Sequence, residues 1–405
     1  MLRFRSAAVV QLAGSVARLA ALFLAGRWIA HKLGPTGVAT MGQVQNMVGL
    51  ASALGVQALH SGFQQGAATR TSPRGRSAWR SSGILLGTAL VFAGSATVAL
   101  AWALGLIVLP FSGGWWIPVL PFLIVPSVWI GAWQGEALGS AHWTRASVWS
   151  ASSGVLQALA WGGAVALWGL PGLVGAILCQ GVLLAPFASR FLAQSPFVRP
   201  PRLAIWWKAW IPLFLAGAAP SLTAPLSGIF LRTLMLGHGW EGAGIWQAAA
   251  RIPDLVYPMW NGVVGAWVLS RVAGAEGTKG LRGSIVLQAF AGTCALSLVL
   301  CAGALPILHL AWGEGFEQAT PLLRLQALAE LPRTLTWILV AALLGRGRTG
   351  AVVLLELLGF TILCGGTYLL QPRFGLAAPA LASILDNLTC LGLATVLWAR
   401  EKRRT

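Results

Sequence analysis

Residues 284–308 read SIVLQAFAGTCALSLVLCAGALPIL, an uninterrupted run without one charged side chain. A helix that spans a bilayer needs about 20 mostly apolar residues, so this segment is long enough to cross a membrane. The rest of the chain has the same character, since 57% of its 405 residues are hydrophobic and only 9% are charged. A soluble domain usually carries about 25% charged residues. The composition excludes an ordinary soluble protein and predicts an all-α membrane protein.

Eleven other segments resemble this one in length and hydrophobicity, so we predict about twelve transmembrane helices. The predicted spans are 7–30, 38–63, 82–110, 116–138, 147–169, 172–194, 209–236, 243–270, 284–308, 319–344, 350–370 and 376–398. A stretch rich in proline separates the sixth span from the seventh. We therefore expect an N-terminal six-helix bundle at 1–195, a cytoplasmic linker at 196–208, and a C-terminal six-helix bundle at 209–405 that ends in a short basic tail.

The two predicted halves are weakly similar to each other. Residues 34–37 (GPTG) lead into the second span as residues 239–242 (GWEG) lead into the eighth. Residues 172–176 open the sixth span as residues 375–380 open the twelfth. Because each half has an even number of spans, such repeats would run parallel and be related by an axis along the membrane normal. This architecture is typical of transporters.

Positive charge is concentrated in alternate connections. If the N-terminus is cytoplasmic, the inner segments hold most of the 28 Lys and Arg residues, whereas the outer connections hold only Lys32 and Arg373 together with Glu241, Glu314 and Glu317. This distribution follows the positive-inside rule and predicts that both termini are cytoplasmic. Most of the net charge of +18 is therefore an orientation signal, and nucleic acid is not an expected partner.

Motifs of enzyme chemistry are nearly absent. Residues 345–350 match GxGxxG, but they join two predicted spans with no strand before them, so the context of a dinucleotide site fails. The sequence has no GxxxxGK[ST] phosphate loop, no HExxH and no GxSxG. We therefore predict no cofactor, no metal site and no catalytic residue, and we do not expect an enzyme.

Charged residues within the spans are the strongest functional signal, because such residues are costly in a bilayer. We single out six arginines there, which facing lipid would together cost on the order of 15–20 kcal/mol. We expect them to face water or one another, although those near the outer ends could instead extend to the interface. The six are Arg18, Arg251 and Arg333, which lie deep, and Arg27, Arg232 and Arg324, which lie toward the outer ends.

Four acids accompany these arginines, namely Asp254, Glu330, Glu356 and Asp386. In 251–254 (RIPD) and 330–333 (ELPR), opposite charges stand three residues apart astride a proline, hence on one helical face. Neutralisation within the helix would explain this spacing. A broken helix that lines a cavity is also where transporters place substrate and ion sites. The excess of arginine predicts a cavity that favours an anion, with the acids as candidate carriers of a proton or cation.

Residues 244–247 (GIWQ), followed by Asp254 and by Ser270-Arg271 at the end of a span, resemble the signature of the polysaccharide flippases of the MOP superfamily. The likeness is greatest to the O-antigen and enterobacterial common antigen translocases, and it covers essentially the whole chain. It extends to Arg18 and Arg27 before LGPTG, to Arg232 and to Glu356. Residues 60–65 (HSGFQQ) depart from it, because they lack the Asn-Gly and Lys-Tyr pattern of these translocases.

The resemblance implies a V-shaped, MATE-like carrier of twelve helices in the bacterial inner membrane. Such a carrier moves an undecaprenyl-pyrophosphate-linked oligosaccharide from the cytoplasmic to the periplasmic leaflet by alternating access. The six arginines would then form the path of the pyrophosphate, and the four acids would couple the movement to an ion gradient. The implied partners are the lipid-linked glycan, membrane lipids, and assembly proteins such as a polymerase and a chain-length regulator.

Two other classes of function stay open. A cation-coupled drug exporter of the MATE type would share the fold, but it would want an acidic cavity. A membrane-embedded glycan polymerase, ligase or glycosyltransferase would need catalytic groups on a sizeable outer loop, and all predicted outer loops are short.

Overall fold

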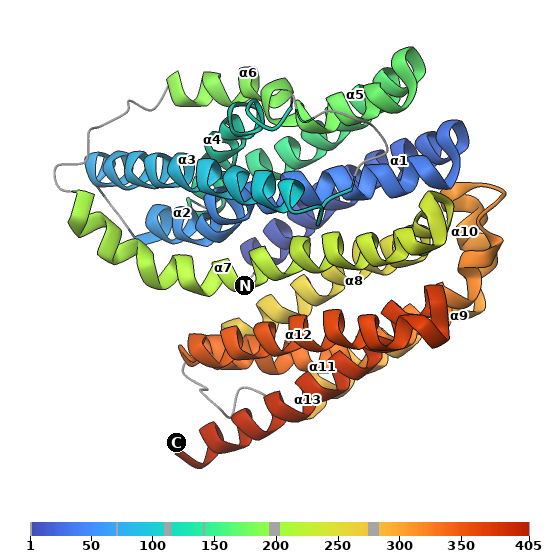
Figure 1. Ribbon diagram of the computed structural model, residues 1–405. Coiled ribbons are helices and arrows are strands. Elements are labelled where there is room, and N and C mark those ends of the chain that lie inside the picture. The colour runs from blue at the N-terminus through green and yellow to red at the C-terminus, as the bar shows by residue number, and fades with distance from the viewer. Residues whose placement is uncertain are drawn as a thin grey trace. The chain divides into compact units, whose positions relative to one another are not determined.

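The computed structural model describes residues 2–69, 72–108, 114, 116–140, 142–193, 203–273 and 283–404, and every regular element in these ranges is a helix (Figure 1). The α-helices are α1 (Leu2–Ser52), α2 (Ala58–Thr69), α3 (Pro73–Ala103), α4 (Leu120–Gly139), α5 (Trp143–Leu178), α6 (Gln180–Ala193), α7 (Leu203–Met235), α8 (Gly239–Ala273), α9 (Gly283–Ala302), α10 (Ala304–Trp312), α11 (Thr320–Gly345), α12 (Thr349–Phe374) and α13 (Ala378–Arg404). The shorter elements are η1 (Ala53–Gln57), η2 (Leu236–His238), η4 (Glu317–Ala319) and η5 (Gly375–Ala377). The predicted all-α class is confirmed for the described residues.

Each of the twelve predicted spans falls on one or more of these helices. Among the described residues, five segments are long and apolar enough to cross a membrane, or six if the bent pair α9 and α10, which meet at 75°, is one span. Two of these segments, Ala13–His60 and Thr349–Glu401, are longer than one crossing needs and each holds two predicted spans. The chain is therefore a multi-pass membrane protein, while the count of twelve stays a prediction.

Within the long helical segments, glycines in the left-handed region turn the chain from one helix to the next. Gly34 and Gly169 both have φ of 61°, and the conformation interrupts α1 and α5. Gly239, with φ of 78°, and Gly375, with φ of 52°, stand at the starts of the later helices. L side chains rarely adopt this conformation. The pairs Gly34/Gly239 and Gly169/Gly375 are 205 and 206 residues apart in the numbering, which supports the internal repeat.

The chain forms two compact units. The first consists of residues 1–33 and 40–229, and the second of residues 34–39 and 230–405. The boundary between the units thus falls inside α7. Most of that linker, like the basic segment 274–282, lies outside the described residues. The predicted division at 1–195 and 209–405 stays a prediction.

In the first unit, α2, α3, α4 and α7 pack around one cluster of apolar side chains. The buried members are Leu59, Phe63, Trp79, Ile84, Ala132 and Trp210. The helices approach closely where glycines meet, and a Cβ added at Gly55 of η1 would lie 2.4 Å from the carbonyl oxygen of Gly87 in α3. Small residues allow such close packing of transmembrane helices.

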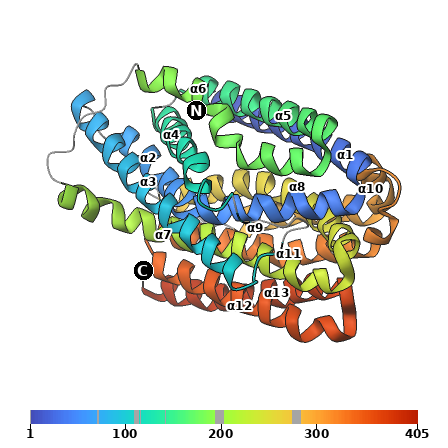
Figure 2. The ribbon, with the colours of Figure 1, turned by 45° about the horizontal axis from the view of Figure 1, so that its top comes forward.

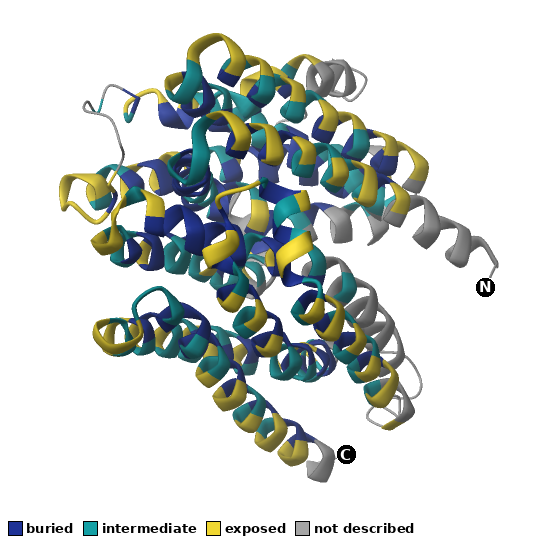
Figure 3. Ribbon diagram, turned by 90° about the vertical axis from the view of Figure 1, so that its right-hand side faces the viewer, coloured by how far each residue is buried: buried dark blue, intermediate teal, exposed yellow. Residues whose placement is uncertain are grey.

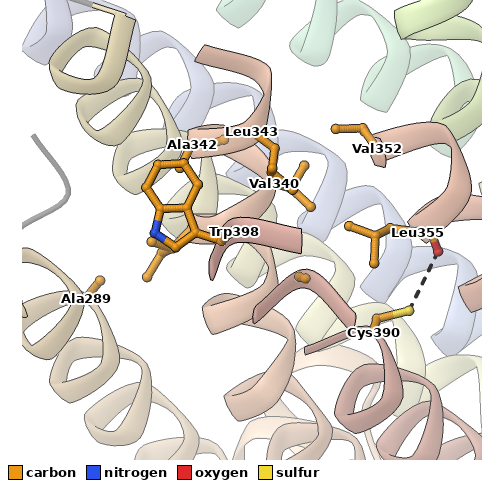
Figure 4. Close-up of a cluster of buried hydrophobic side chains, with 11 residues drawn as sticks. Ala289, Val340, Ala342, Leu343, Val352, Leu355, Cys390 and Trp398 are labelled. Atoms are coloured by element: carbon orange, nitrogen blue, oxygen red, sulfur yellow. Dashed lines mark hydrogen bonds between the residues drawn. The ribbon is translucent and has the colours of Figure 1, made fainter. Parts of the chain in front are cut away.

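In the second unit, α11 is the central helix, because it packs against α8, α9 and α13. Helix α12 lies along α13, as Figures 1 and 2 both show. A buried cluster joins α9, α11, α12 and α13, with Trp398 and Leu355 among its larger side chains (Figure 4). In it the Cys390 thiol lies 3.6 Å from the carbonyl oxygen of Leu355. Two polar groups of adjacent helices thus meet inside an otherwise apolar cluster.

The exposed faces of the helices are rich in apolar side chains. Figure 3 shows that buried and exposed residues fall on different sides of individual helices. Leu159 and Trp168 of α5 are each 67% exposed, and Leu369 of α12 is 75% exposed. Water would penalise so many exposed large apolar groups, whereas lipid tails accept them. This surface agrees with the membrane assignment.

Candidate functional site

Helix α11 contains a proline, Pro332, between Glu330 and Arg333. Proline lacks an N–H group, so it cannot complete the helical hydrogen bond of the residue four positions earlier. Side chains of two neighbouring helices donate hydrogen bonds to backbone carbonyl oxygens of α11 in the turn before Pro332. Ser297 Oγ of α9 donates to the oxygen of Ala327 at 2.9 Å, and Asn387 Nδ2 of α13 donates to the oxygen of Ala329 at 3.0 Å. Side chains of α9 and α13 therefore hold the backbone of α11 where the charged pair projects.

Glu330 and Arg333 form the intrahelical ion pair that their spacing predicts. Arg333 Nη1 donates to Glu330 Oε1 at 2.8 Å. The Glu330 side chain is fully buried, whereas 36% of the Arg333 side chain is exposed. The second carboxylate oxygen, Glu330 Oε2, is buried and has no hydrogen-bond partner among the described residues. A charge in this position is costly unless it is paired.

The other predicted pair, Arg251 and Asp254 of α8, does not form a direct ion pair. Asp254 is exposed and Arg251 is half-buried. Asp254 lies near enough to Arg251 for their charges to attract each other. Their charged atoms are nevertheless farther apart than the 4.0 Å of the ion pairs found among the described residues. The same residue spacing thus gives a direct contact in α11 and a looser one in α8.

Arg232 at the end of α7 belongs to the same unit as α8. It is only 3% exposed. Its place near the outer end of a predicted span would have allowed it to extend to the membrane interface, but the side chain is buried in the protein instead. Its Nε donates to Gln247 Oε1 of α8 at 3.0 Å, and its guanidinium carbon lies 5.9 Å from the centroid of the Trp246 ring. The charges of Arg251 and Asp254 also act on it. The buried guanidinium thus contacts a neutral amide and an aromatic face.

The remaining predicted arginines are spread over both units. In the first unit, Arg18 of α1 packs its side chain against Gly154 of α5, where an added Cβ would lie 2.6 Å from Arg18 Cγ. Arg27 of α1 is exposed. In the second unit, Arg324 of α11 is also exposed, and its Nε donates to the carbonyl oxygen of Cys301 at 3.1 Å. The structure thus places Arg232 against Gln247, one helical turn before Arg251 in α8, but gives Arg27 and Arg324 exposed positions.

The four predicted acids differ in their surroundings. Asp254 is exposed and Glu330 is fully buried, whereas Glu356 of α12 and Asp386 of α13 are half-buried. Asp386 lies against Gly359 of α12, since an added Cβ there would come within 2.8 Å of Asp386 Oδ1. The Cys390 thiol is 3.3 Å from the same oxygen. Glu330 is thus the acid that the structure removes most completely from water.

Two arginine–glutamate ion pairs were not among the sequence predictions. In the first unit, Arg80 Nη1 of α3 donates to both oxygens of Glu136 in α4, at 3.0 and 3.2 Å, and both side chains are largely buried. A small pocket lined by Phe63, Ala67, Arg76, Trp79, Arg80 and Glu136 lies beside it. In the second unit, Arg348 Nε pairs with Glu401 Oε2 at 2.8 Å. Each pair joins residues more than 50 positions apart, so helix periodicity could not reveal it.

Comparison with known proteins places the fold. No protein-family model and no curated protein matches the chain. Among solved structures, an inward-facing multidrug resistance MATE family transporter of the MOP superfamily shares 15% identity and a TM-score of 0.74, over 97% of this chain and 98% of that one. The outward-facing form of such a transporter shares 18% identity and a TM-score of 0.65, over 97% and 94%. The chain has the MATE transporter fold.

A third match with the MATE fold concerns charge. It is a MOP superfamily transporter from Pyrococcus furiosus, described as having a binding pocket of reverse polarity that suggests a different function. It shares 16% identity with this chain and a TM-score of 0.70, over 97% of this chain and 94% of that one. The MATE-like architecture expected from the sequence is therefore confirmed, while identities this low leave the substrate to be argued from the residues.

Proposed function

We propose that this protein is a flippase that moves an undecaprenyl-pyrophosphate-linked oligosaccharide, of the O-antigen or common-antigen type, from the cytoplasmic to the periplasmic leaflet. The single observation that carries the proposal is the contact of buried Arg232 with Gln247 of α8, because Gln247 lies one helical turn before Arg251 and the two cations therefore share one region of the unit. Like charges in a low-dielectric site repel each other. An anionic ligand would relieve that repulsion, and a pyrophosphate is such a ligand.

The chemistry of arginine suits this substrate. A guanidinium presents a planar fork of donors that pairs with two phosphate oxygens at once. Arg333 adds a third cation on α11, with more than a third of its side chain exposed. The lipid tail of the substrate can stay in the bilayer, so only the pyrophosphate and the glycan need a polar route. We assign Arg18, Arg27, Arg232, Arg251, Arg324 and Arg333 to the pyrophosphate path.

Movement needs a driving force that is not ATP, because the sequence has no phosphate loop. An ion gradient, or consumption of the product outside, is compatible with alternating access in this fold. Asp254, Glu330, Glu356 and Asp386 are the candidate ion-coupling groups. The proposed setting is the bacterial inner membrane with both termini in the cytoplasm, where polysaccharide assembly proteins are the expected neighbours.

Export of cationic drugs is the second candidate function, because similar structures are described as multidrug resistance transporters. A site for organic cations would favour acidic side chains, whereas the six arginines assigned to the pyrophosphate path outnumber the four candidate ion-coupling acids. The local charge around Arg232 and Arg251 favours the anionic substrate. The two functions are separated by direct assay.

The decisive experiment uses purified protein in liposomes that contain a fluorescent undecaprenyl-pyrophosphate oligosaccharide. A membrane-impermeant quencher reports how much probe reaches the outer leaflet. We expect transfer to be faster than in protein-free liposomes and absent for the Arg232→Gln variant. Efflux of a cationic dye from cells that express the protein is the parallel measurement. Dye efflux without lipid transfer would overturn the flippase proposal and support drug export.

A further inference from the structure

The ion pair between Glu330 and Arg333 is unequal in its access to solvent. The contact is short, with Nη1 and Oε1 at 2.8 Å. None of the Glu330 side chain is exposed, but 36% of the Arg333 side chain is. Arg333 therefore connects a fully buried carboxylate with the exposed surface of α11.

Glu330 depends on Arg333 for its charge balance. Among the described residues, Arg333 is the cation that forms an ion pair with Glu330, and the charge of Asp254 nearby has the same sign as that of Glu330. The ionisable groups on the packed helices around the pair are Asp254 and Tyr257 of α8, Cys294 and Cys301 of α9, and Asp386 of α13. None of these supplies a positive charge. If Arg333 moved away, Glu330 would be a buried carboxylate without a counter-ion.

One oxygen of Glu330 is already available for a proton. Oε2 is buried and accepts no hydrogen bond from the described residues, whereas Oε1 accepts the bond from Arg333. A buried carboxylate that loses its partner takes up a proton, because the neutral acid avoids most of the cost of burial. The neighbouring hydroxyl of Tyr257 is engaged with Ser297 Oγ at 2.6 Å, so it is not a ready substitute for Arg333.

We infer that Glu330 is a proton-binding site that is loaded when Arg333 leaves it for a phosphate group of the substrate. The inference rests on the proposed function and adds to it the charge state of the substrate-bound carrier. When the diphosphate binds Arg333, the Arg333–Glu330 contact breaks and Glu330 Oε2 takes one proton from water. When the diphosphate leaves, Arg333 returns and the proton is released. The bound complex then carries one negative charge fewer than the diphosphate alone brings.

The structure offers a matched control in the same unit. Arg348 and Glu401 also pair at 2.8 Å, with the arginine 45% and the carboxylate 11% exposed. This carboxylate retains some contact with solvent, unlike that of Glu330. Loss of Arg348 should therefore leave Glu401 ionised, because water can solvate it, whereas loss of Arg333 should not leave Glu330 ionised.

The first test needs no substrate. Infrared spectroscopy of the purified, full-length protein at neutral pH reports protonated carboxyl groups by their C=O stretching band. We expect Arg333→Gln to show a protonated carboxyl that is absent from the wild type and from Arg348→Gln, and that disappears in the double variant Arg333→Gln/Glu330→Gln. A spectrum of Arg333→Gln without the new band would overturn the inference, provided that the variant elutes as the wild type does in size-exclusion chromatography.

The second test uses farnesyl diphosphate as the probe and farnesol as the uncharged control. Titration calorimetry in buffers of different ionisation enthalpy gives the number of protons taken up on binding. We expect about one proton for each diphosphate bound by the wild type and about none for Glu330→Gln, which should still bind. The Glu401→Gln variant should behave as the wild type, and farnesol should take up no proton.

The outcomes separate this inference from the proposed function. Binding of farnesyl diphosphate without proton uptake, or uptake that persists in Glu330→Gln, would overturn the inference and leave the flippase proposal intact. Failure of the wild-type protein to bind farnesyl diphosphate would overturn both. Proton uptake that is lost only in Glu330→Gln, together with the new carboxyl band in Arg333→Gln, supports both.

Discussion

The indole ring of Trp210 stacks on that of Trp79, with ring centroids 4.2 Å apart and planes inclined by 12°. The two residues belong to α7 and α3, and Trp210 Nε1 also donates to Ser82 Oγ of α3 at 3.2 Å. Trp79 Nε1 donates to the carbonyl oxygen of Gly62 in α2 at 2.9 Å. These contacts join the first part of α7 to α2 and α3 within the first unit.

The first prediction concerns Gly62, which packs against the Trp210 ring of this stack. A Cβ at Gly62 would lie 2.1 Å from the Trp210 ring, so Gly62→Ala must displace the indole and should cost about 1–3 kcal/mol of stability. Gly163→Ala in α5 is the matched control, because an added Cβ there meets nothing within 4 Å. Thermal unfolding in detergent should show a lower midpoint for Gly62→Ala and an unchanged or higher one for Gly163→Ala. Equal midpoints for the two variants would contradict the packing described here.

The second prediction concerns the buried ion pair of Arg80 and Glu136, whose side chains are 5% and 19% exposed. Removing one partner leaves the other without compensation, which typically costs about 3–5 kcal/mol when a pair is buried. Arg80→Gln and Glu136→Gln should therefore each be less stable than the double variant. Thermal unfolding of the three proteins gives the coupling. Additive effects of the single changes would show that the pair contributes little.

The third prediction concerns the proposed anion path at Arg251. Neutralising this residue removes a charge-assisted contact worth about 1.5–3 kcal/mol, which corresponds to about a 10- to 100-fold weaker affinity for the diphosphate. Arg251→Lys keeps the charge but loses the planar fork, so it should retain partial lipid transfer where Arg251→Gln does not. The control is Arg373→Gln, since Arg373 is exposed at the end of α12. Normal transfer by Arg251→Gln at wild-type abundance would remove this residue from the path.

A related comparison separates substrate binding from simple ion pairing. If Arg251 only neutralised Asp254, the double variant Arg251→Gln/Asp254→Asn would restore lipid transfer. Arg333 and Glu330 form an ion pair at 2.8 Å, whereas the charged atoms of Arg251 and Asp254 are more than 4.0 Å apart. We therefore expect the double variant to accumulate in the membrane and to remain inactive. The measurement is lipid transfer scored beside protein abundance, and recovered transfer would favour ion pairing.

The fourth prediction concerns topology, and it follows from the loop charges. In a variant without the five native cysteines, single cysteines at Arg145 and Thr349 should be shielded from an impermeant thiol reagent in intact cells. Cysteines at the exposed positions Glu241 and Glu314 should be labelled. These sites lie on opposite sides of the membrane if alternate connections are cytoplasmic. Reversed labelling would discard the predicted orientation and the direction of export that depends on it.

The sequence by itself determined the membrane class and the helical architecture. Runs such as 284–308 have no charge and no alternative to a helix in lipid, because the bilayer offers no water to backbone polar groups. The glycines at 34 and 239 marked the repeat, since a turn between two helices needs a residue that tolerates positive φ. The contact of Glu330 with Arg333 followed from a spacing of three on one helix.

Only the tertiary structure decided which of the charged residues are buried and which are exposed. Arg232 is buried and Arg324 is exposed although both stand near the outer ends of predicted spans, and the difference comes from Gln247 and Trp246 on the adjacent helix. Arg80 lies two residues before the predicted third span, and only the structure shows that it pairs with Glu136, 56 residues away. Burial and pairing between helices depend on residues distant in the chain, and helical periodicity carries no information about which distant face comes into contact.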